Sequence, residues 1–80
     1  MVGRELQAFG KAVQKLRLDQ GYSQERLALT CGLDRTYISG IERGVRNPTL
    51  RTIYTIATAL GITPSALLLV SENLSRDEAD

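Results

Sequence analysis

Residues 24–43 read QERLALTCGLDRTYISGIER, and this stretch decides the fold. Its apolar residues recur three or four positions apart on both sides of Gly32, which is the pattern of two short helices joined by a tight turn. Ala28 is small enough for two helices to approach closely, and Gly32 can adopt the positive φ that such a turn requires. The side chains expected to fix the pair on the core are Leu27, Leu33, Ile38 and Ile41. The spacing therefore predicts a helix-turn-helix, with helices over residues 24–30 and 35–43.

Three further helices are predicted around this pair from the same periodicity. The first covers about residues 4–20, the fourth begins after Thr49, and the fifth spans about residues 64–70. Their expected inward faces are Leu6, Phe9, Val13 and Leu16 in the first helix, and Leu50, Ile53, Ala57 and Leu60 in the fourth. The expected caps are Ser23, Asp34, Thr49 and Thr63, and the expected terminators are Gly21, Gly32, Gly44 and Gly61. No strand-like alternation, repeat or linker is visible, so we expect one compact all-α domain of five helices.

Length and composition limit what a chain of 80 residues can be. An apolar share of 42% is enough for one core, and a chain this short is commonly stabilised by oligomerisation. The longest apolar run, residues 66–70, is far shorter than the roughly 20 residues that cross a bilayer. The N-terminal residues also lack the apolar stretch of a secretion signal. We therefore expect a cytoplasmic protein with no membrane partner.

Two residue types restrict the chemistry that the chain can perform. Histidine is absent, so no imidazole can serve as a catalytic base or a metal ligand. Cys31 is the single cysteine and cannot form an internal disulfide, and we expect it to fill the core as a small apolar side chain. These observations exclude most enzyme and zinc-site hypotheses, and we expect no catalytic residue, metal or cofactor.

Charge is distributed unevenly although the formal net charge is only +1. Residues 71–80 carry a net charge of −3, whereas residues 1–70 carry +4. A basic body with an acidic tail is compatible with nucleic-acid binding, and it is also compatible with an ordinary solvated surface. We interpret Lys11 and Lys15 as part of such a solvated face.

Five segments carry a resemblance to a known family. They are LRLDQGYSQERLA (16–28), CGLD (31–34), YISGIERG (37–44), NPTL (47–50) and ALGITPSALL (59–68). With these segments the chain resembles the Cro and phage-repressor group of helix-turn-helix proteins, often called the XRE family, which share a lambda-repressor-like fold. Within that family, DRTYISGIER and the length are most similar to the controller proteins of restriction-modification systems. The resemblance implies a homodimer that binds specific DNA and both activates and represses its own operon.

The predicted recognition helix presents a polar face away from the core. With its two isoleucines inward, the outward residues are Thr36, Ser39, Gly40 and Arg43, with Arg35 and Tyr37 on the flanks. The first residues of a helix in the major groove reach base edges, and an arginine can donate two hydrogen bonds to guanine. We therefore expect base contacts from Arg35, Thr36 and Tyr37, with Gly40 letting the helix lie close to the DNA. Packing between helices is the alternative role for Tyr37.

Other roles follow from the resemblance. It implies a further base or minor-groove contact by Arg46, and a structural ion pair between Arg17 and Glu42. The backbone contacts that we expect beside them are Gln24, Ser39, Arg43, Asn47 and Thr49. For Arg43 and Arg46, the alternative is an ordinary solvated surface.

The leucine-rich end of the domain predicts a dimer interface. Leu67, Leu68, Leu69 and Val70 are consecutive, and Leu74 follows. One short helix cannot bury all of them in its own domain, and an exposed apolar patch usually marks an interface. We expect a two-fold dimer through Leu67, Leu68 and Val70, with residues 1–74 as the domain and residues 75–80 as a mobile acidic tail. A fully internal helix followed by a disordered tail is the alternative.

Three classes of function remain open from the sequence. The first is a restriction-modification controller, the second another repressor of the same fold, such as a phage repressor or an antitoxin, and the third a protein-interaction module. The polar, cationic outer face of the recognition helix argues against the third. A dimer would place two recognition helices in successive major grooves of a pseudo-palindromic operator, where it would block or recruit RNA polymerase. No pocket is evident, so we expect no small-molecule ligand.

Overall fold

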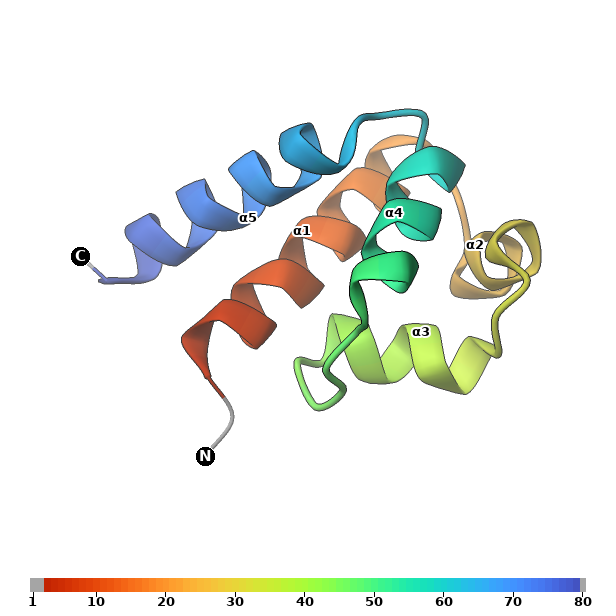
Figure 1. The fold of residues 1–80 in the computed structure, drawn as a ribbon, viewed down its shortest axis with the longest axis horizontal. Coiled ribbons are helices and arrows are strands. Elements are labelled where there is room, and N and C mark those ends of the chain that lie inside the picture. The colour runs from red at the N-terminus through yellow and green to blue at the C-terminus, as the bar shows by residue number, and fades with distance from the viewer. Residues whose placement is uncertain (1–2, 80) are drawn as a thin grey trace.

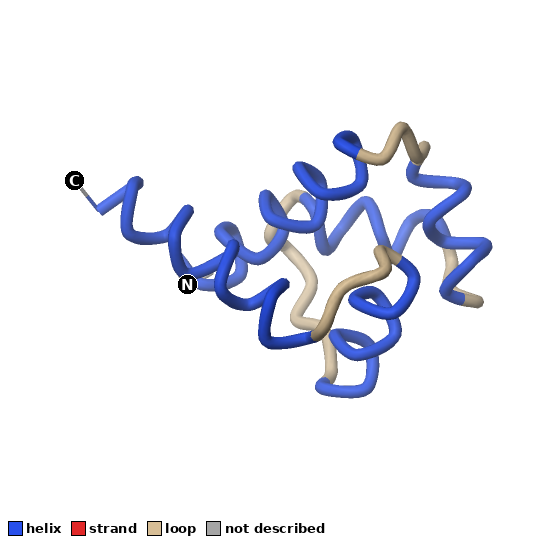
Figure 2. Tube along the Cα trace, turned by 90° about the horizontal axis from the view of Figure 1, so that it is seen from above, coloured by secondary structure: helices blue, strands red, loops and turns tan. Residues whose placement is uncertain are grey.

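The computed structural model describes residues 3–79, with side chains described as far as Arg76, and contains five helices. They are α1 (Arg4–Asp19), α2 (Gln24–Cys31), α3 (Arg35–Glu42), α4 (Leu50–Ala59) and α5 (Pro64–Ala79). Figure 1 shows α5 running beside α1 on one side of the domain, with α2, α3 and α4 grouped on the other. Viewed from above in Figure 2, the last turns of α5 extend beyond the rest of the molecule. The predicted all-α architecture is confirmed.

Side-chain caps fix where helices α2 to α5 begin. The Ser23 hydroxyl accepts a hydrogen bond from the Arg26 amide at 3.0 Å, and the Asp34 carboxylate accepts one from the Thr36 amide at 2.9 Å. The other capping oxygens are those of Thr49 and Thr63, each 3.1 Å from the amide it accepts from. Between α2 and α3, Gly32 has φ of 68°, so the glycine that the turn was predicted to need is in the left-handed region.

The core takes side chains from all five helices. Its largest fully buried members are Val13, Leu27, Ile38, Ile41, Ile56 and Leu67. Burying a side chain of this size stabilises the fold by roughly 1.5–3 kcal/mol relative to leaving it exposed. Because Ile38 and Ile41 are 0% and 1% exposed, the orientation of α3 about its own axis is fixed.

Leu50 does not belong to the inward face of α4 as expected, because it is 69% exposed. It is the first residue of that helix, and Ile53, one turn later, is itself only half-buried. The first turn of α4 therefore extends past the edge of the core, while Ile56, Ala57 and Leu60 are buried.

The fifth helix is longer than predicted. It continues to Ala79, so the expected end of this helix near residue 70 is wrong. The mobility expected of residues 75–80 stays a prediction, and Asp80 lies outside the described residues. No glycine or proline follows Pro64, and Leu74 lies two turns after Leu67 and packs against the core, so the apolar stripe of α5 continues. Over residues 3–79 no single helix is long and apolar enough to cross a bilayer, and only the pair formed by α4 and residues 64–76, bent by 99°, passes such a test.

Helix α1 crosses the end of α3 in backbone contact, through a glycine whose role the sequence did not reveal. A Cβ added at Gly10 would collide with the carbonyl oxygens of Ile41 and Glu42. Gly10 is fully enclosed in the middle of α1, where alanine would otherwise be the better helix former. The crossing therefore depends on the missing side chain.

Replacing Gly10 with alanine should destabilise the protein by about 1–3 kcal/mol, because the added methyl group forces α1 away from α3. Denaturant unfolding at a fixed protein concentration measures this change. The exposed Gln14→Ala change in the same helix is the control and should alter the free energy of unfolding by less than about 0.5 kcal/mol. A Gly10→Ala protein as stable as the natural one would contradict the close crossing.

The cap at Asp34 should make stability depend on pH. Hydrogen bonds from the Thr36 amide, and then from the Thr36 hydroxyl, lower the pKa of Asp34 in the folded protein. Its contribution to stability is therefore complete above the ordinary aspartate pKa of about 3.9 and is lost as the pH falls through the lower folded-state value. Asp34→Asn keeps a capping oxygen without the titration, and all other acidic groups are common to both proteins.

Unfolding free energies of the natural protein and of Asp34→Asn should consequently differ most near neutral pH. The difference should shrink on acidification below about pH 4, as the carboxylate becomes protonated. An unchanging difference between pH 6.5 and pH 2.5 would show that the charge on Asp34 contributes nothing to the cap.

Candidate nucleic-acid interface

Helix α3 lies along one edge of the domain (Figure 1). The residues on its outer face are polar. Ile38, Ile41 and Glu42 point inward and are buried. Of the residues predicted to contact DNA from this helix, Arg35 and Thr36 are exposed, Tyr37 and Ser39 are half-buried, and Arg43 is exposed at the C-cap. The sequence-predicted face is therefore brought together on one surface, with the exception of Gly40.

A buried ion pair holds α3 to α1. Nε of Arg17 donates to Oε2 of Glu42 at 2.7 Å, and Nη2 donates to Oε1 at 3.0 Å. The remaining nitrogen, Nη1, donates to the Tyr22 carbonyl at 2.7 Å, so the guanidinium is bonded along both edges. The hydrogen bond with Glu42 raises the pKa of Arg17 against the opposing effect of burial. The structure thus contains the Arg17–Glu42 pair that the family resemblance implied, and the pair fastens α3 to α1.

Gln24 connects this pair to the outer face of α3. Its Nε2 donates to Oε1 of Glu42 at 3.0 Å, and its Oε1 accepts from Nη1 of Arg35 at 3.4 Å. A chain of hydrogen bonds therefore runs from the buried pair, through the first residue of α2, to the first residue of α3. The outermost link is long and exposed, so Arg35 can exchange it for another acceptor at little cost. The contact of Gln24 with the DNA backbone stays a prediction, and the sequence gave no signal of its bond to Glu42.

The hydroxyl group of Thr36 already takes part in the N-terminal cap of its own helix. Its hydroxyl donates to Oδ1 of Asp34 at 2.8 Å, which leaves its oxygen lone pairs and its methyl group for other contacts. In the major groove those features suit an amino group of adenine or cytosine, or the methyl group of thymine.

Arg46 lies across α3. Its guanidinium carbon is 4.8 Å from the centre of the Tyr37 ring, within the range of a cation–π contact. Its aliphatic stem covers Gly40, which is buried. Arg46 therefore covers the outer side of Gly40, and the expectation that Gly40 lets the helix lie close to the DNA stays a prediction.

The remaining predicted contacts sit in the loop between α3 and α4. Thr49 caps α4, with its hydroxyl within hydrogen-bond distance of both the amide and the hydroxyl of Thr52. Asn47 is exposed and borders a groove on the side of α1 and α5. Among the described residues, no group of three or more histidine, cysteine or acidic side chains could hold a metal ion.

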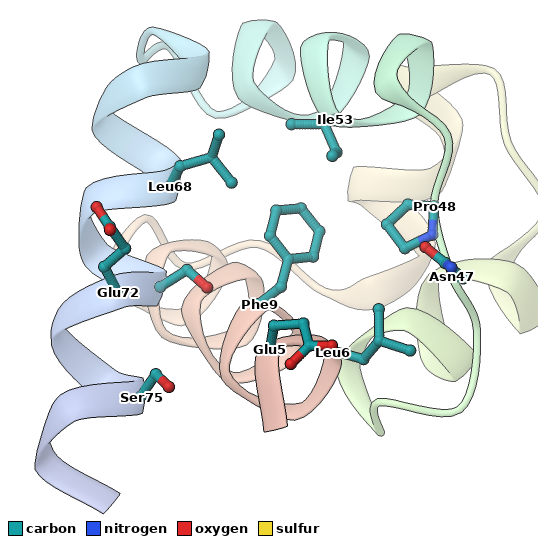
Figure 3. Close-up of a pocket in the computed structure, with 10 residues that line it drawn as sticks. Glu5, Leu6, Phe9, Asn47, Pro48, Ile53, Leu68, Glu72 and Ser75 are labelled. Atoms are coloured by element: carbon teal, nitrogen blue, oxygen red, sulfur yellow. The ribbon is translucent and has the colours of Figure 1, made fainter. Parts of the chain in front are cut away.

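No pocket was evident from the sequence, and that groove corrects this expectation. It encloses about 550 Å³ between α1, the start of α4 and α5, and Figure 3 shows Phe9 at its centre, between Leu68 of α5 and Pro48. The other residues that line it are Glu5, Leu6, Asn47, Ile53, Ser71, Glu72 and Ser75. Its floor is apolar and its rim is polar. Its signal in the sequence was indirect, because the leucine-rich helix exceeded what one face could bury.

Of the residues predicted for a dimer interface, the structure excludes Leu67. Its side chain is 0% exposed because it belongs to the core, and successive helical residues are turned by about 100°. Leu68 and Leu69 are consequently turned outward, at 42% and 56% exposed, and Val70 is half-buried against the core. The outward apolar surface of α5 is therefore centred on Leu68 and Leu69.

Comparisons with known proteins place this geometry in a family. Residues 13–67 match the family model described as helix-turn-helix. The control protein C.BamHI of Bacillus amyloliquefaciens is 52% identical over 61 residues, which are 75% of this chain and 75% of that protein.

Two solved structures extend the comparison. The restriction-modification controller protein C.AhdI from Aeromonas hydrophila is 50% identical, with a TM-score of 0.76 over 78% of this chain and 94% of that one. The controller C.Esp1396I, solved as a tetramer with its natural 35 base-pair operator, is 35% identical, with a TM-score of 0.82 over 89% and 93% of the two chains. Family match, sequence identity and fold agree that this chain belongs to the helix-turn-helix family and, within it, to the restriction-modification controller proteins.

Proposed function

We propose that the protein is a homodimeric transcriptional regulator that binds a pseudo-palindromic operator and controls its own restriction-modification operon. The observation that carries this proposal is the outward polar face of α3, fixed in orientation by two buried isoleucines and by the Arg17–Glu42 pair. A relative of the same fold was solved on its operator. A protein-interaction module would not need a cationic surface on a helix held so rigidly.

Base recognition would come from the first turn of α3. Arg35 is exposed at the helix N-terminus, where a side chain reaches base edges, and its fork can donate twice to O6 and N7 of guanine. Thr36 and Tyr37 would contact neighbouring bases, and Arg46 would contribute from beside Tyr37. Arg35 is exposed and is the first residue of α3, so it carries the sharpest expectation.

Contacts to phosphates would fix the register of α3 on the duplex. The first amides of α2 and the side chain of Gln24 can receive one phosphate, which is favoured by the positive end of that helix. Further backbone contacts would come from Ser39, Arg43, Asn47 and Thr49. Since each neutralised phosphate releases counterions, operator affinity should fall steeply as salt rises.

A second copy of this chain is the occupant that we infer for the groove beside α5. The groove has an apolar floor with Phe9. Of the two exposed leucines on α5, Leu68 lines the groove and Leu69 is the next residue along the helix. Val70 would contribute its remaining exposed surface. A two-fold dimer of this kind presents two α3 helices roughly 34 Å apart, which matches successive major grooves. The position of the operator relative to the promoter would then decide the regulation, because a bound dimer either blocks RNA polymerase or recruits it. Binding to operator DNA implies a cytoplasmic location.

Removing Arg35 should relax base preference at one position in each half-site. Selection of bound sites from random duplex DNA identifies the operator, and competition binding then measures affinity for each base at each position. Arg35→Ala should lose about 1–3 kcal/mol at that position alone. Arg35→Lys keeps the charge but not the paired donors, so it should retain affinity for DNA and still lose discrimination. Unchanged discrimination in Arg35→Ala would reject the assignment.

Introducing a charge on the outer face of α5 should separate the dimer. Leu68→Asp places a carboxylate in an apolar interface, so sedimentation at several protein concentrations should show a monomer, with weak operator binding. Leu29→Asp is the matched control, because Leu29 is 82% exposed on α2, away from the groove, and that variant should remain a dimer. If Leu68→Asp sediments as an intact dimer, the two copies associate through another surface.

A further inference from the structure

The loop after α3 is fastened to the recognition helix at Gly40. The Val45 amide donates to the Gly40 carbonyl at 3.0 Å, and the Gly44 amide donates to the Ile41 carbonyl at 3.0 Å. These bonds turn the chain back over the helix it has just left, so that Arg46 begins directly beside Gly40. The backbone hydrogen bonds alone therefore place the Cα of Arg46 beside Gly40, whatever contacts its side chain makes.

The backbone conformation of Gly40 does not explain why this residue is a glycine. It sits inside α3 and is not among the glycines of positive φ, although glycine is one of the weakest helix formers. The three atoms nearest to an added Cβ would be Cβ, Cγ and Cδ of Arg46, and Cγ would be in direct collision. The missing side chain thus makes a notch in α3 that the stem of Arg46 occupies.

The far end of the same side chain is held by Tyr37, one turn earlier on α3. The guanidinium carbon lies 4.8 Å from the ring centre. A ring stack uses the face of a guanidinium, whereas its N–H donors lie in its plane and point outward. Notch and ring together hold a long, flexible side chain in one direction while its donors stay on the surface of α3.

We propose that Gly40 is a positioning residue for DNA recognition, which seats Arg46 on α3 so that a loop arginine becomes part of the base-reading surface. This inference rests on the proposed operator binding, and it adds that part of the base specificity comes from the way Gly40 places Arg46. Arginine loses considerable rotamer freedom when it is immobilised at an interface. A side chain that is already held in its bound orientation loses less rotamer freedom when it binds DNA. Gly40 would therefore act on DNA through Arg46 and not through close approach of its own backbone.

The test is a double-mutant cycle of Gly40→Ala and Arg46→Ala, measured on the selected operator and on its single-base variants. Gly40→Ala alone should lower operator affinity on the order of 2- to 10-fold, the effect of unseating one flexible side chain. It should relax base preference at the same position as Arg46→Ala and leave the Arg35-dependent position unchanged. In the Arg46→Ala background, Gly40→Ala should have no further effect on affinity.

A measurement on the free protein tests the seat without DNA. Ring-current shifts of the Arg46 side-chain protons, caused by Tyr37, should be present in the natural protein and in Tyr37→Phe, and should disappear in Gly40→Ala. Should Gly40→Ala fold poorly, the double variant should recover, because the added methyl group then enters the space that Arg46 has left. Ser39→Ala adds no Cβ and serves as the control with unchanged shifts.

Three outcomes would overturn the proposal. Equal losses from Gly40→Ala with and without Arg46 would mean that glycine acts on the DNA or on the helix directly. Unchanged ring-current shifts in Gly40→Ala would show that Arg46 needs no notch. A loss of specificity in Arg35→Ala but none in Arg46→Ala would reject the role of Gly40 in seating Arg46 and leave operator binding by α3 intact. A natural protein that enriches no DNA sequence would instead reject both this role and the proposed operator binding.

Discussion

The placement of α3 depends on one interaction, the two-pronged hydrogen bond between the Arg17 guanidinium and the Glu42 carboxylate. Both side chains are almost fully buried, at 8% and 2% exposed, so removing either partner would leave a charge without its counter-charge in the interior. The pair joins the end of the first helix to the end of the recognition helix. Gln24 carries the same network outward to Arg35, so core stability and the orientation of the reading surface share one set of hydrogen bonds.

Two opposite requirements are met on different parts of this small domain. The face of α3 must stay polar and accessible, while the groove between α1 and α5 offers an apolar floor centred on Phe9. A domain of this length has little core to spare, and association of two copies through the proposed interface would supply apolar burial that one copy lacks. The proposed dimer would also give DNA recognition two-fold symmetry, so one interface would serve both stability and specificity.

Local sequence signals predicted the helices and the face of α3 well, because their causes are local. Caps such as Asp34, the turn glycine Gly32 and the spacing of Ile38 and Ile41 each act within a few residues. The errors concern packing between distant segments. Nothing in the sequence near Leu67 shows that it is buried in the core while Leu68 and Leu69 are exposed. The notches at Gly10 and Gly40 are likewise visible only once the backbone of α3, or the stem of Arg46, is placed against them.

The central claim is that α3, held by the buried pair, is the element that enters the DNA. Titration of the labelled protein with its selected operator duplex, followed through backbone amide signals, tests it most directly. The largest changes should fall within residues 35–47 and at Gln24, with small changes along α1. Amides of α3 that stay unmoved, while another surface of the domain shifts, would contradict the account.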